Sequence, residues 1–157
     1  MPLRREGHLK HEGCSIENSE VGMKPVFVDF QEHGDWRGQL VALEENKNIP
    51  FPIKRVYFMY DTLEGVVRGK HSHRNLKQVL FCVAGACTIR LDDGKDKTDV
   101  RLNQPSRGLF IGPSTWREMY DFEPGTVLMV LASEYYDESD YIRDYDMFLE
   151  SVAEENE

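Results

Sequence analysis

The stretch Gly65–Gly85, with the sequence GVVRGKHSHRNLKQVLFCVAG, joins a group of ionisable side chains to a run of strand-forming residues. His71 and His73 are two residues apart, and on a β-strand residues i and i+2 point to the same face. Two imidazoles on the inner face of a small β-fold can bind a metal, act as a base and its orienting partner, or fill a polar gap. Because Arg68 and Lys70 flank the pair, we interpret this stretch as a functional site.

On both sides of this stretch, short runs of β-branched and aromatic residues alternate with turn residues. The Asp-Gly pair within Asp92–Lys95 supplies the positive-φ residue that a tight hairpin requires. We predict strands at Val26–Phe30, Gln39–Glu44, Lys54–Tyr60, Gln78–Val83, Ala86–Leu91, Asp99–Leu102, Gly108–Ile111, Trp116–Phe122 and Thr126–Ala132.

Apolar residues recur at helical spacing only within Ile142–Glu154. The whole pattern therefore predicts an all-β, antiparallel sandwich or barrel with one short C-terminal helix. Residues 1–25 are polar and show no period, so we expect a flexible N-terminal extension. Residues 26–157 then form a single domain, as expected for a chain of 157 residues.

The charge of the chain is distributed unevenly along its length. The formal net charge is −9, yet residues 37–117 carry +6, between segments of −3 (residues 1–36) and −12 (residues 118–157). A basic centre within an acidic protein suits a small anionic ligand in a pocket better than a long polyanion, which the remaining surface would repel. We therefore expect no nucleic-acid partner.

The cysteines and the apolar runs indicate the compartment. Cys14, Cys82 and Cys87 are odd in number and lack the spacing of a disulfide framework or a zinc site, so we expect buried thiols. No apolar run approaches the roughly 20 residues of a membrane-spanning helix, and no apolar core follows the basic N-terminus as in a secretory signal. We expect a cytoplasmic protein without membrane partners.

The spacing of Gly65, His71-x-His73, Gln78 and Gly85 resembles the first conserved motif of the cupin superfamily, which implies a jelly-roll β-barrel. Metal-dependent cupins place a Glu ligand near Gln78 and another His in a second motif, where this chain has Arg117. A neutral amide is a poor ligand for a divalent metal and a guanidinium is no ligand, so we expect neither a catalytic metal nor another cofactor.

Several longer motifs resemble the sugar 3,4-ketoisomerase family over about Val26 to Phe148. That family acts on thymidine-diphosphate-linked 4-keto-6-deoxyglucose and yields a 3-keto sugar, which an aminotransferase then converts to a 3-amino sugar. The related 3,5-epimerases share the Arg-Gly-x-His element and are the near alternative. The motifs are Asn46–Phe51, Lys54–Tyr57, Arg68–His73, Leu91–Gly94, Gly112–Met119 and Leu131–Ile142.

Moving a ketone from C4 to C3 requires removal of the C3 proton, an enediol and reprotonation at C4. A histidine with a pKa near 6.5 suits this task, and His71 matches the base position of the Arg-Gly-x-His element. We assign His73 to orienting, relaying or holding the substrate. Tyr57 and Arg117 are candidate donors to the enediolate oxygen, and the Tyr57 hydroxyl can also shuttle a proton between O3 and O4.

Guanidinium groups match the two charges of a pyrophosphate, so we predict contacts from Arg68 and Arg37, with Lys70 a weaker candidate. For Arg37 and Lys70, a solvated surface charge is an equally good interpretation. The resemblance also implies that the positions of Arg37 and Arg117, where family members carry Arg, Tyr or His, help to set which face of C4 is protonated. The Arg/Arg pair leaves the C4 configuration of the product open.

The family resemblance, and the gain available to a small barrel from exchanging N-terminal strands with a second copy, predict a homodimer. A nucleotide-sugar sensor without catalysis is the rival interpretation from another class, and a metal-dependent dioxygenase is a weaker third. We assign Trp116, Phe110, Phe122 and Phe148 to packing. Tyr135–Glu138 is interpreted as a solvated acidic face.

Overall fold

The computed structural model describes residues 22–157, in which β-strands dominate and one α-helix closes the chain. The predictions about Cys14, and about most of the N-terminal extension 1–25, lie outside the described residues. The elements are β1 Val26–Asp29, β2 Glu32–Asp35, β3 Gly38–Val41, β4 Arg55–Met59, β5 Arg68–His73, β6 Gln78–Ala84, β7 Cys87–Asp92, β8 Lys97–Leu102, β9 Arg107–Ile111, β10 Trp116–Tyr120, β11 Val127–Ala132, the 3-10 turn Glu138–Asp140, β12 Tyr141–Ile142 and α1 Tyr145–Glu155.

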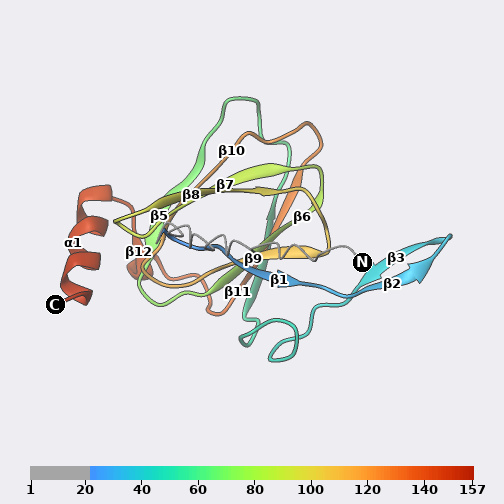
Figure 1. Ribbon diagram of the computed structural model, residues 1–157, viewed down its shortest axis with the longest axis horizontal. Coiled ribbons are helices and arrows are strands. Elements are labelled where there is room, and N and C mark those ends of the chain that lie inside the picture. The colour runs from blue at the N-terminus through green and yellow to red at the C-terminus, as the bar shows by residue number, and fades with distance from the viewer. Residues whose placement is uncertain (1–21) are drawn as a thin grey trace, which may run out of the picture.

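Two five-stranded sheets form the body of the molecule (Figure 1). The first has the order β1-β9-β6-β11-β4 and the second the order β12-β5-β10-β7-β8. The pairings between these strands are antiparallel, and consecutive strands often lie in different sheets, as in a jelly roll. The expected antiparallel jelly roll with a short C-terminal helix is confirmed, although the strands form two sheets and not a closed barrel.

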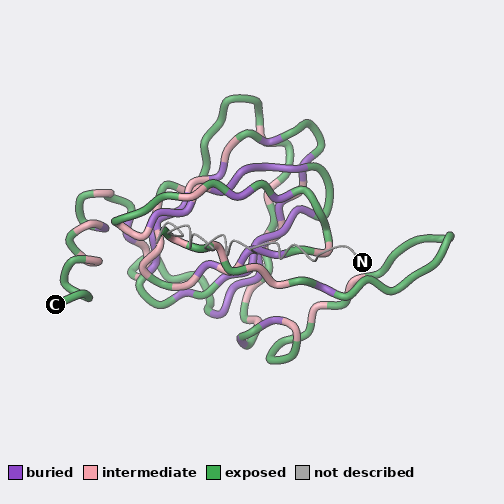
Figure 2. Tube along the Cα trace, viewed as in Figure 1, coloured by how far each residue is buried: buried purple, intermediate pink, exposed green. Residues whose placement is uncertain are grey.

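The main apolar core fills the space between the two sheets. Alternate residues of each strand point inward, so that Leu80 and Cys82 of β6 face Ile89 of β7 and Met119 of β10. The intervening residues Val79 and Phe81 point outward into a second core, which the segment around Ile49 and Phe51 covers. Figure 2 shows the buried residues concentrated along the strands of the two sheets. Burial of both faces of β6 explains its nearly continuous apolar sequence.

The C-terminal helix packs on the second sheet. Asp144 caps the helix because its side chain accepts a hydrogen bond from the Met147 amide. Phe148 lies against Trp116, with 5.7 Å between the ring centroids, and is fully buried. The packing role predicted for these two aromatic residues is confirmed, and the observed helix begins three residues later than the predicted Ile142.

Some boundaries differ from those predicted. The hairpin at Gly94 is confirmed between β7 and β8, with a φ of 90° at Gly94. The predicted strand ranges did not include β5, β2 or the two-residue β12. β2 was missed because Glu32–Asp35 is polar and exposed. The buried thiols expected at Cys82 and Cys87 are confirmed.

The β2–β3 hairpin projects away from the sandwich, at the end opposite α1 (Figure 1). Nearly all of its residues are exposed, and Trp36 at its turn is 92% exposed. The hairpin thus presents two large apolar side chains, Trp36 and Leu40, to solvent.

Candidate active site

A β-bulge in β5 shapes the motif that contains the two histidines. Against β10, His71 pairs with Arg117, Gly69 with Glu118 and Arg68 with Met119, so Lys70 is the extra residue. On a regular strand Arg68 and His71 would face opposite sides, but with the bulge both side chains line one cavity. Gly69 permits this geometry because its φ is 82° and an added Cβ would lie 3.0 Å from the carbonyl oxygen of Arg117.

His73 is held by a carboxylate that comes from a distant part of the sequence. Its Nδ1 lies 3.2 Å from Oδ2 of Asp140. The backbone amide of Leu76 also donates to this oxygen, and that of Asn75 donates to Oδ1 of the same carboxylate. An ionised carboxylate only accepts, so Nδ1 of His73 carries the proton and Nε2 is left with a free lone pair. That Nε2 is buried and has no hydrogen-bond partner among residues 22–157.

Both imidazoles are neutral near neutral pH. Burial, followed by the positive charge of Arg117, lowers the pKa of His71 from 6.5 to about 4. The same two causes, in the same order, lower the pKa of His73 to about 2, so its contact with Asp140 is a hydrogen bond from a neutral imidazole and not an ion pair. The rings of His71 and His73 are 4.8 Å apart, and Tyr141 packs against both. His71 is therefore in the free-base form that can accept a proton.

A buried chain of hydrogen bonds runs from β10 to β4. Arg117 is fully buried and donates from Nη1 to Oε1 of Gln78 at 2.5 Å and from Nη2 to the carbonyl of Thr115 at 2.8 Å. Gln78 in turn donates from Nε2 to the hydroxyl of Tyr57 at 2.8 Å. Burial raises the pKa of Tyr57, so its hydroxyl keeps its proton at neutral pH.

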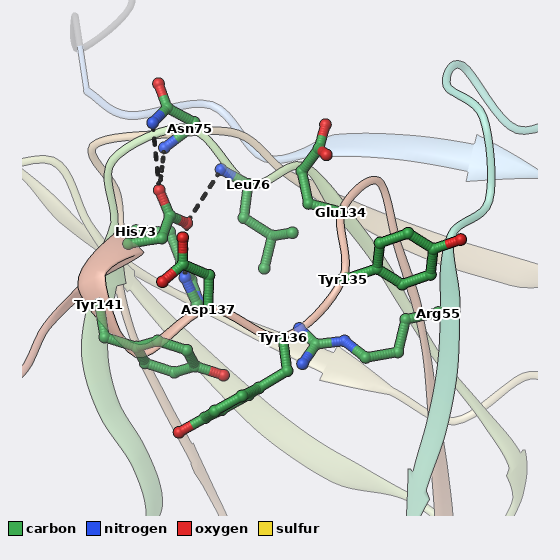
Figure 3. A pocket seen from close by; sticks show the side chains of 10 residues that line it. Arg55, His73, Asn75, Leu76, Glu134, Tyr135, Tyr136, Asp137 and Tyr141 are labelled. Carbon is green, nitrogen blue, oxygen red and sulfur yellow. Dashed lines mark hydrogen bonds and ion pairs between the residues drawn. The ribbon is translucent and has the colours of Figure 1, made fainter.

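Two adjacent cavities open beside these side chains. The cavity that we call the sugar cavity has a volume of about 380 Å³ and is lined by Arg55, Tyr57, Met59, Arg68, Gly69, His71, Met119, Tyr136, Tyr141 and Arg143. The outer cavity has a volume of about 470 Å³ and is lined by Arg55, His73, Asn75, Leu76, Glu134, Tyr135, Tyr136, Asp137, Asp140 and Tyr141. Arg55, Tyr136 and Tyr141 line both cavities, and Figure 3 shows the side chains of Arg55 and Tyr136 lying close together.

The cavities include cations that the sequence analysis did not select. Arg55 lies near the rings of Tyr57 and Tyr136, and its buried Nε has no hydrogen-bond partner in the described part of the chain. Arg143 lies over the ring of Tyr141 and forms an ion pair with Glu138. Arg55 belongs to the Lys54–Tyr57 motif, but only the fold shows that this end of β4 faces β5 across a cavity.

The structure brings together His71, Tyr57 and Arg68 around the sugar cavity, with His73 and Arg117 packed directly behind them. It does not bring Lys70 or Arg37 there. Lys70 is the exposed bulge residue, and Arg37 lies at the turn of the β2–β3 hairpin, where its guanidinium binds Asp35. Tyr136 contradicts the interpretation of Tyr135–Glu138 as only a solvated face, because it lines both cavities.

The donor set does not resemble a metal centre. Within residues 22–157, no group of three or more His, Cys, Asp or Glu side chains is placed to hold a metal ion. Gln78 occupies the ligand position of metal-dependent cupins, but both ends of its amide are engaged by Arg117 and Tyr57. The buried cation of Arg117 further disfavours a divalent metal beside it.

Comparison with known proteins agrees with this geometry. The family model described as FdtA: WxcM-like, C-terminal matches residues 23–153. The chain belongs to this FdtA family. Among curated proteins, the TDP-4-oxo-6-deoxy-alpha-D-glucose-3,4-oxoisomerase of Aneurinibacillus thermoaerophilus is 51% identical over 134 residues, which cover 85% of this chain and 96% of that protein.

Solved structures of 3,4-ketoisomerases are also similar to this FdtA-family chain. QdtA from Thermoanaerobacterium thermosaccharolyticum, solved in complex with TDP, is 46% identical with a TM-score of 0.82, covering 83% of this chain and 96% of that one. The WlaRB TDP-quinovose 3,4-ketoisomerase of Campylobacter jejuni is 48% identical with a TM-score of 0.77, covering 80% and 97%. The alternative of an epimerase has weaker support, since the rmlC epimerase of Mycobacterium tuberculosis is only 17% identical (TM-score 0.63; coverage 76% and 72%) and shares the fold alone.

Proposed function

We propose that this protein is a 3,4-ketoisomerase that converts TDP-4-keto-6-deoxyglucose to a TDP-linked 3-keto-6-deoxyhexose. The observation that carries the proposal is the sugar cavity, in which a neutral imidazole, a protonated phenol and a guanidinium face one another as His71, Tyr57 and Arg68. A ligand-binding sensor has no need of a free base with a lowered pKa, so the geometry favours catalysis.

In the proposed reaction, His71 removes the proton from C3 and later returns it to C4. The electron pair of the C3–H bond forms the enediolate, and negative charge develops on O4. Tyr57 donates its proton to O4 and accepts the proton of the O3 hydroxyl, so that the carbonyl moves to C3. Atoms and electrons balance within the sugar, and no external oxidant or reductant is required.

The buried positive charge of Arg117 supports this step in two ways. It stabilises the enediolate through space, because a fixed charge in a water-poor site needs no reorganisation during the reaction. It also keeps His71 neutral before substrate arrives, as its contribution to the lowered pKa indicates. The negative pyrophosphate of a bound substrate acts in the opposite direction and makes His71 a stronger base in the complex.

We propose that the reaction needs no metal. Gln78 stands where metal-dependent cupins have a ligand, and its amide is hydrogen-bonded to Arg117 and Tyr57. The free lone pair on Nε2 of His73 can accept a hydrogen bond from a hydroxyl group and does not require a metal ion. Activity that persists after exhaustive treatment with a chelator, with metal content followed by elemental analysis, tests this part of the proposal.

For the pyrophosphate, we propose Arg68 together with Arg55. Arg68 is exposed at the rim of the sugar cavity, and Arg55 lies between the two cavities without a carboxylate partner among residues 22–157. Two guanidinium groups that line the same cavity as His71 suit a diphosphate linked to the sugar. We expect Arg55→Ala to raise KM with little change in kcat, since this contact is made equally in the ground state and the transition state.

We propose that the working unit is a homodimer. The β2–β3 hairpin has no core of its own, and the edge strand β4 exposes Val56 and Phe58, each more than half exposed. An unpaired edge with apolar side chains is normally covered, and a hairpin of a second copy is a suitable cover. Arg37 at the hairpin turn would then serve the cavity of the partner.

Mixing two variants distinguishes this arrangement from an isolated chain. If Arg37 serves the partner's site, a hybrid dimer of Arg37→Ala and His71→Asn has one site with both defects and one with none, so activity returns. If Arg37 acts within its own chain, each site keeps one defect and mixing restores nothing. Light scattering on the unmixed protein reports the oligomeric state directly.

We propose a cytoplasmic location. The thiols of Cys82 and Cys87 are free and lie 3.6 Å apart within hydrogen-bond distance, a state that a reducing compartment preserves. None of the helices among residues 22–157 has the length and apolar character needed to cross a membrane.

The deciding experiment follows TDP-4-keto-6-deoxyglucose by proton NMR in deuterated buffer. Conversion to a 3-keto product supports the proposal, and the coupling constants of the product give its C4 configuration. Deuterium exchange at C3 and C5 with the ketone still at C4 would instead indicate an epimerase. Binding without any change of the sugar would indicate a sensor.

A further inference from the structure

Gln78 is a buried polar residue that has no assigned role as the base and does not line the sugar cavity. Its side chain is fully buried between the sheets at the start of β6 and makes hydrogen bonds to Arg117 on one side and Tyr57 on the other. In this way it links a fixed cation to the phenol that lines the sugar cavity. A glutamine is a costly residue to bury, and this one is satisfied at both ends of its amide.

The direction of these hydrogen bonds is fixed by chemistry. A guanidinium has donors only, so the group that faces Arg117 must be the carbonyl oxygen of Gln78. The amide nitrogen therefore faces Tyr57 and donates to its hydroxyl oxygen. A hydroxyl that accepts from Gln78 cannot give its own proton to Gln78, so that proton is free to point into the sugar cavity.

We propose that Gln78 is a positioning residue that directs the proton of Tyr57 toward the sugar oxygens. This inference rests on the proposed ketoisomerase function and names the group that orients its proton shuttle. Arg117 acts at the far end of the same relay, because it decides which end of the amide faces Tyr57. Gln78 itself gains and loses no proton during the reaction.

The inference predicts a specific defect in Gln78→Glu, a change of nearly identical shape. A carboxylate accepts from both neighbours, so the Tyr57 hydroxyl turns to donate to residue 78 and no longer offers its proton to O4. His71 still removes the C3 proton, but the transfer of the hydroxyl protons slows. The imidazolium proton then has more time to exchange with solvent before the ketone moves.

The experiment compares wild type, Gln78→Glu and Gln104→Glu, using TDP-4-keto-6-deoxyglucose in deuterated buffer with chelator present. Gln104 lies on an exposed loop outside both cavities, so Gln104→Glu makes the same chemical change away from the site. NMR follows ketone transfer and deuterium incorporation at C3 in the same sample. We expect Gln78→Glu to slow ketone transfer about 100-fold and to raise the ratio of deuterium exchange to ketone transfer about tenfold or more. Gln104→Glu should change neither the transfer rate nor this ratio.

An unchanged ratio in Gln78→Glu, whether at full or reduced activity, would overturn the inference. Failure of the wild type to transfer the ketone would overturn the proposed function as well, so the two failures are distinguishable. Exchange at C3 also shows that the variant is folded. Should Gln78→Glu not accumulate, Gln78→Leu removes the same donor, and a retained wild-type ratio in that variant would equally contradict the relay.

Discussion

The space between the two sheets has a polar end and an apolar end, and the same strands supply both. On β6 the inward positions change from Gln78 to Leu80 and Cys82, on β10 from Arg117 to Met119, and on β4 from Tyr57 to Met59. One step of two residues along a strand, about 7 Å, thus separates a hydrogen-bonded network from a close-packed core.

The two ends carry different costs. The apolar end contributes the free energy of burial and tolerates no cavity. At the polar end a fully buried guanidinium, and an imidazole whose Nε2 has no partner among residues 22–157, are kept away from water. This burial costs stability, and a role in function accounts for that cost. Substitutions at the polar end should therefore change activity more than stability, and those at the apolar end the reverse.

The largest expected effect on activity is that of His71→Asn. Loss of a general base lowers the rate by about 10²- to 10⁴-fold, while nucleotide-sugar binding stays close to that of wild type because Arg68 and Arg55 are untouched. We expect the free energy of unfolding to change by less than about 1 kcal/mol, since Nδ1 of His71 has no partner to lose. Turnover assays, calorimetric binding and urea unfolding check the three parts, and near-normal turnover would contradict the assignment of the base.

The largest expected effect on stability is that of Leu80→Ala at the apolar end. Leu80 is fully buried in the main core, and such truncations cost about 2–5 kcal/mol. At a temperature where the variant is folded, kcat should remain within a few-fold of wild type. Leu63→Ala, at a position that is 74% exposed, is the matched control and should leave the unfolding midpoint nearly unchanged. Equal destabilisation by both variants would contradict the division of the interior.

Features that depend only on neighbouring residues in the chain could be predicted from the sequence. The two histidines, Tyr57 and Arg68 were predicted from short motifs, and the alternation of apolar residues predicted most of the strands. The bulge at Lys70 was not predictable from alternation, because alternation assumes a regular strand. Its consequence, that Arg68 joins the face of His71, is visible only in the register with β10.

The sequence analysis also missed residues whose roles depend on contacts with residues far away in the chain, because sequence patterns do not show such contacts. Asp140 is 67 residues from His73, and nothing in the acidic stretch around it indicates which carboxylate meets an imidazole. Gln78 was recognised only as a missing metal ligand, since its hydrogen bonds reach 39 residues to Arg117 and 21 residues to Tyr57. Conversely, Arg37 and Lys70 were selected by charge, and charge alone does not tell which side of a strand or which copy of the chain a residue serves.

A smaller expected effect concerns pH. With the pKa of His71 at about 4, kcat/KM should stay level from neutral pH down to about pH 4 and fall below it as the base becomes protonated. In Arg117→Met the lowering charge is gone, the pKa of His71 rises, and this acid limb moves to higher pH. Arg90→Met removes an exposed arginine of the same sheet and should leave the limb in place. A limb that does not move in Arg117→Met would contradict the electrostatic role of Arg117.

The lowered pKa of His71 also makes the stability of the folded state depend on pH. This dependence decides how the pH profile of kcat/KM should be measured. The unfolded chain binds protons at His71 below about pH 6.5, whereas the folded chain does so only below about 4. The unfolded state therefore binds more protons within this window, and stability falls as the pH is lowered through it. Rates near pH 4 should be taken from short pH jumps, with a return to neutral pH to show that the enzyme is recovered.

A further effect on catalysis, smaller than that of His71→Asn, is expected of Asp140→Asn. The carboxylate receives backbone amides of Asn75 and Leu76 besides Nδ1 of His73, and an amide at this position must turn an NH₂ group toward one of these donors. If the NH₂ faces His73, the imidazole proton moves to Nε2, and the free lone pair of that nitrogen is lost. We expect kcat to fall about tenfold and the free energy of unfolding to fall by about 1–3 kcal/mol.

Asp137→Asn is the matched control, because Asp137 lines the same outer cavity and is bonded to Ser139 but not to a histidine. It removes an equal charge and should leave kcat unchanged. Nitrogen-15 NMR of the imidazoles separates the two possible causes of a slow Asp140→Asn enzyme. A tautomer shift of His73 supports the orienting role, whereas an unshifted tautomer with the same loss of rate would mean that Asp140 acts only through the backbone turn at Asn75.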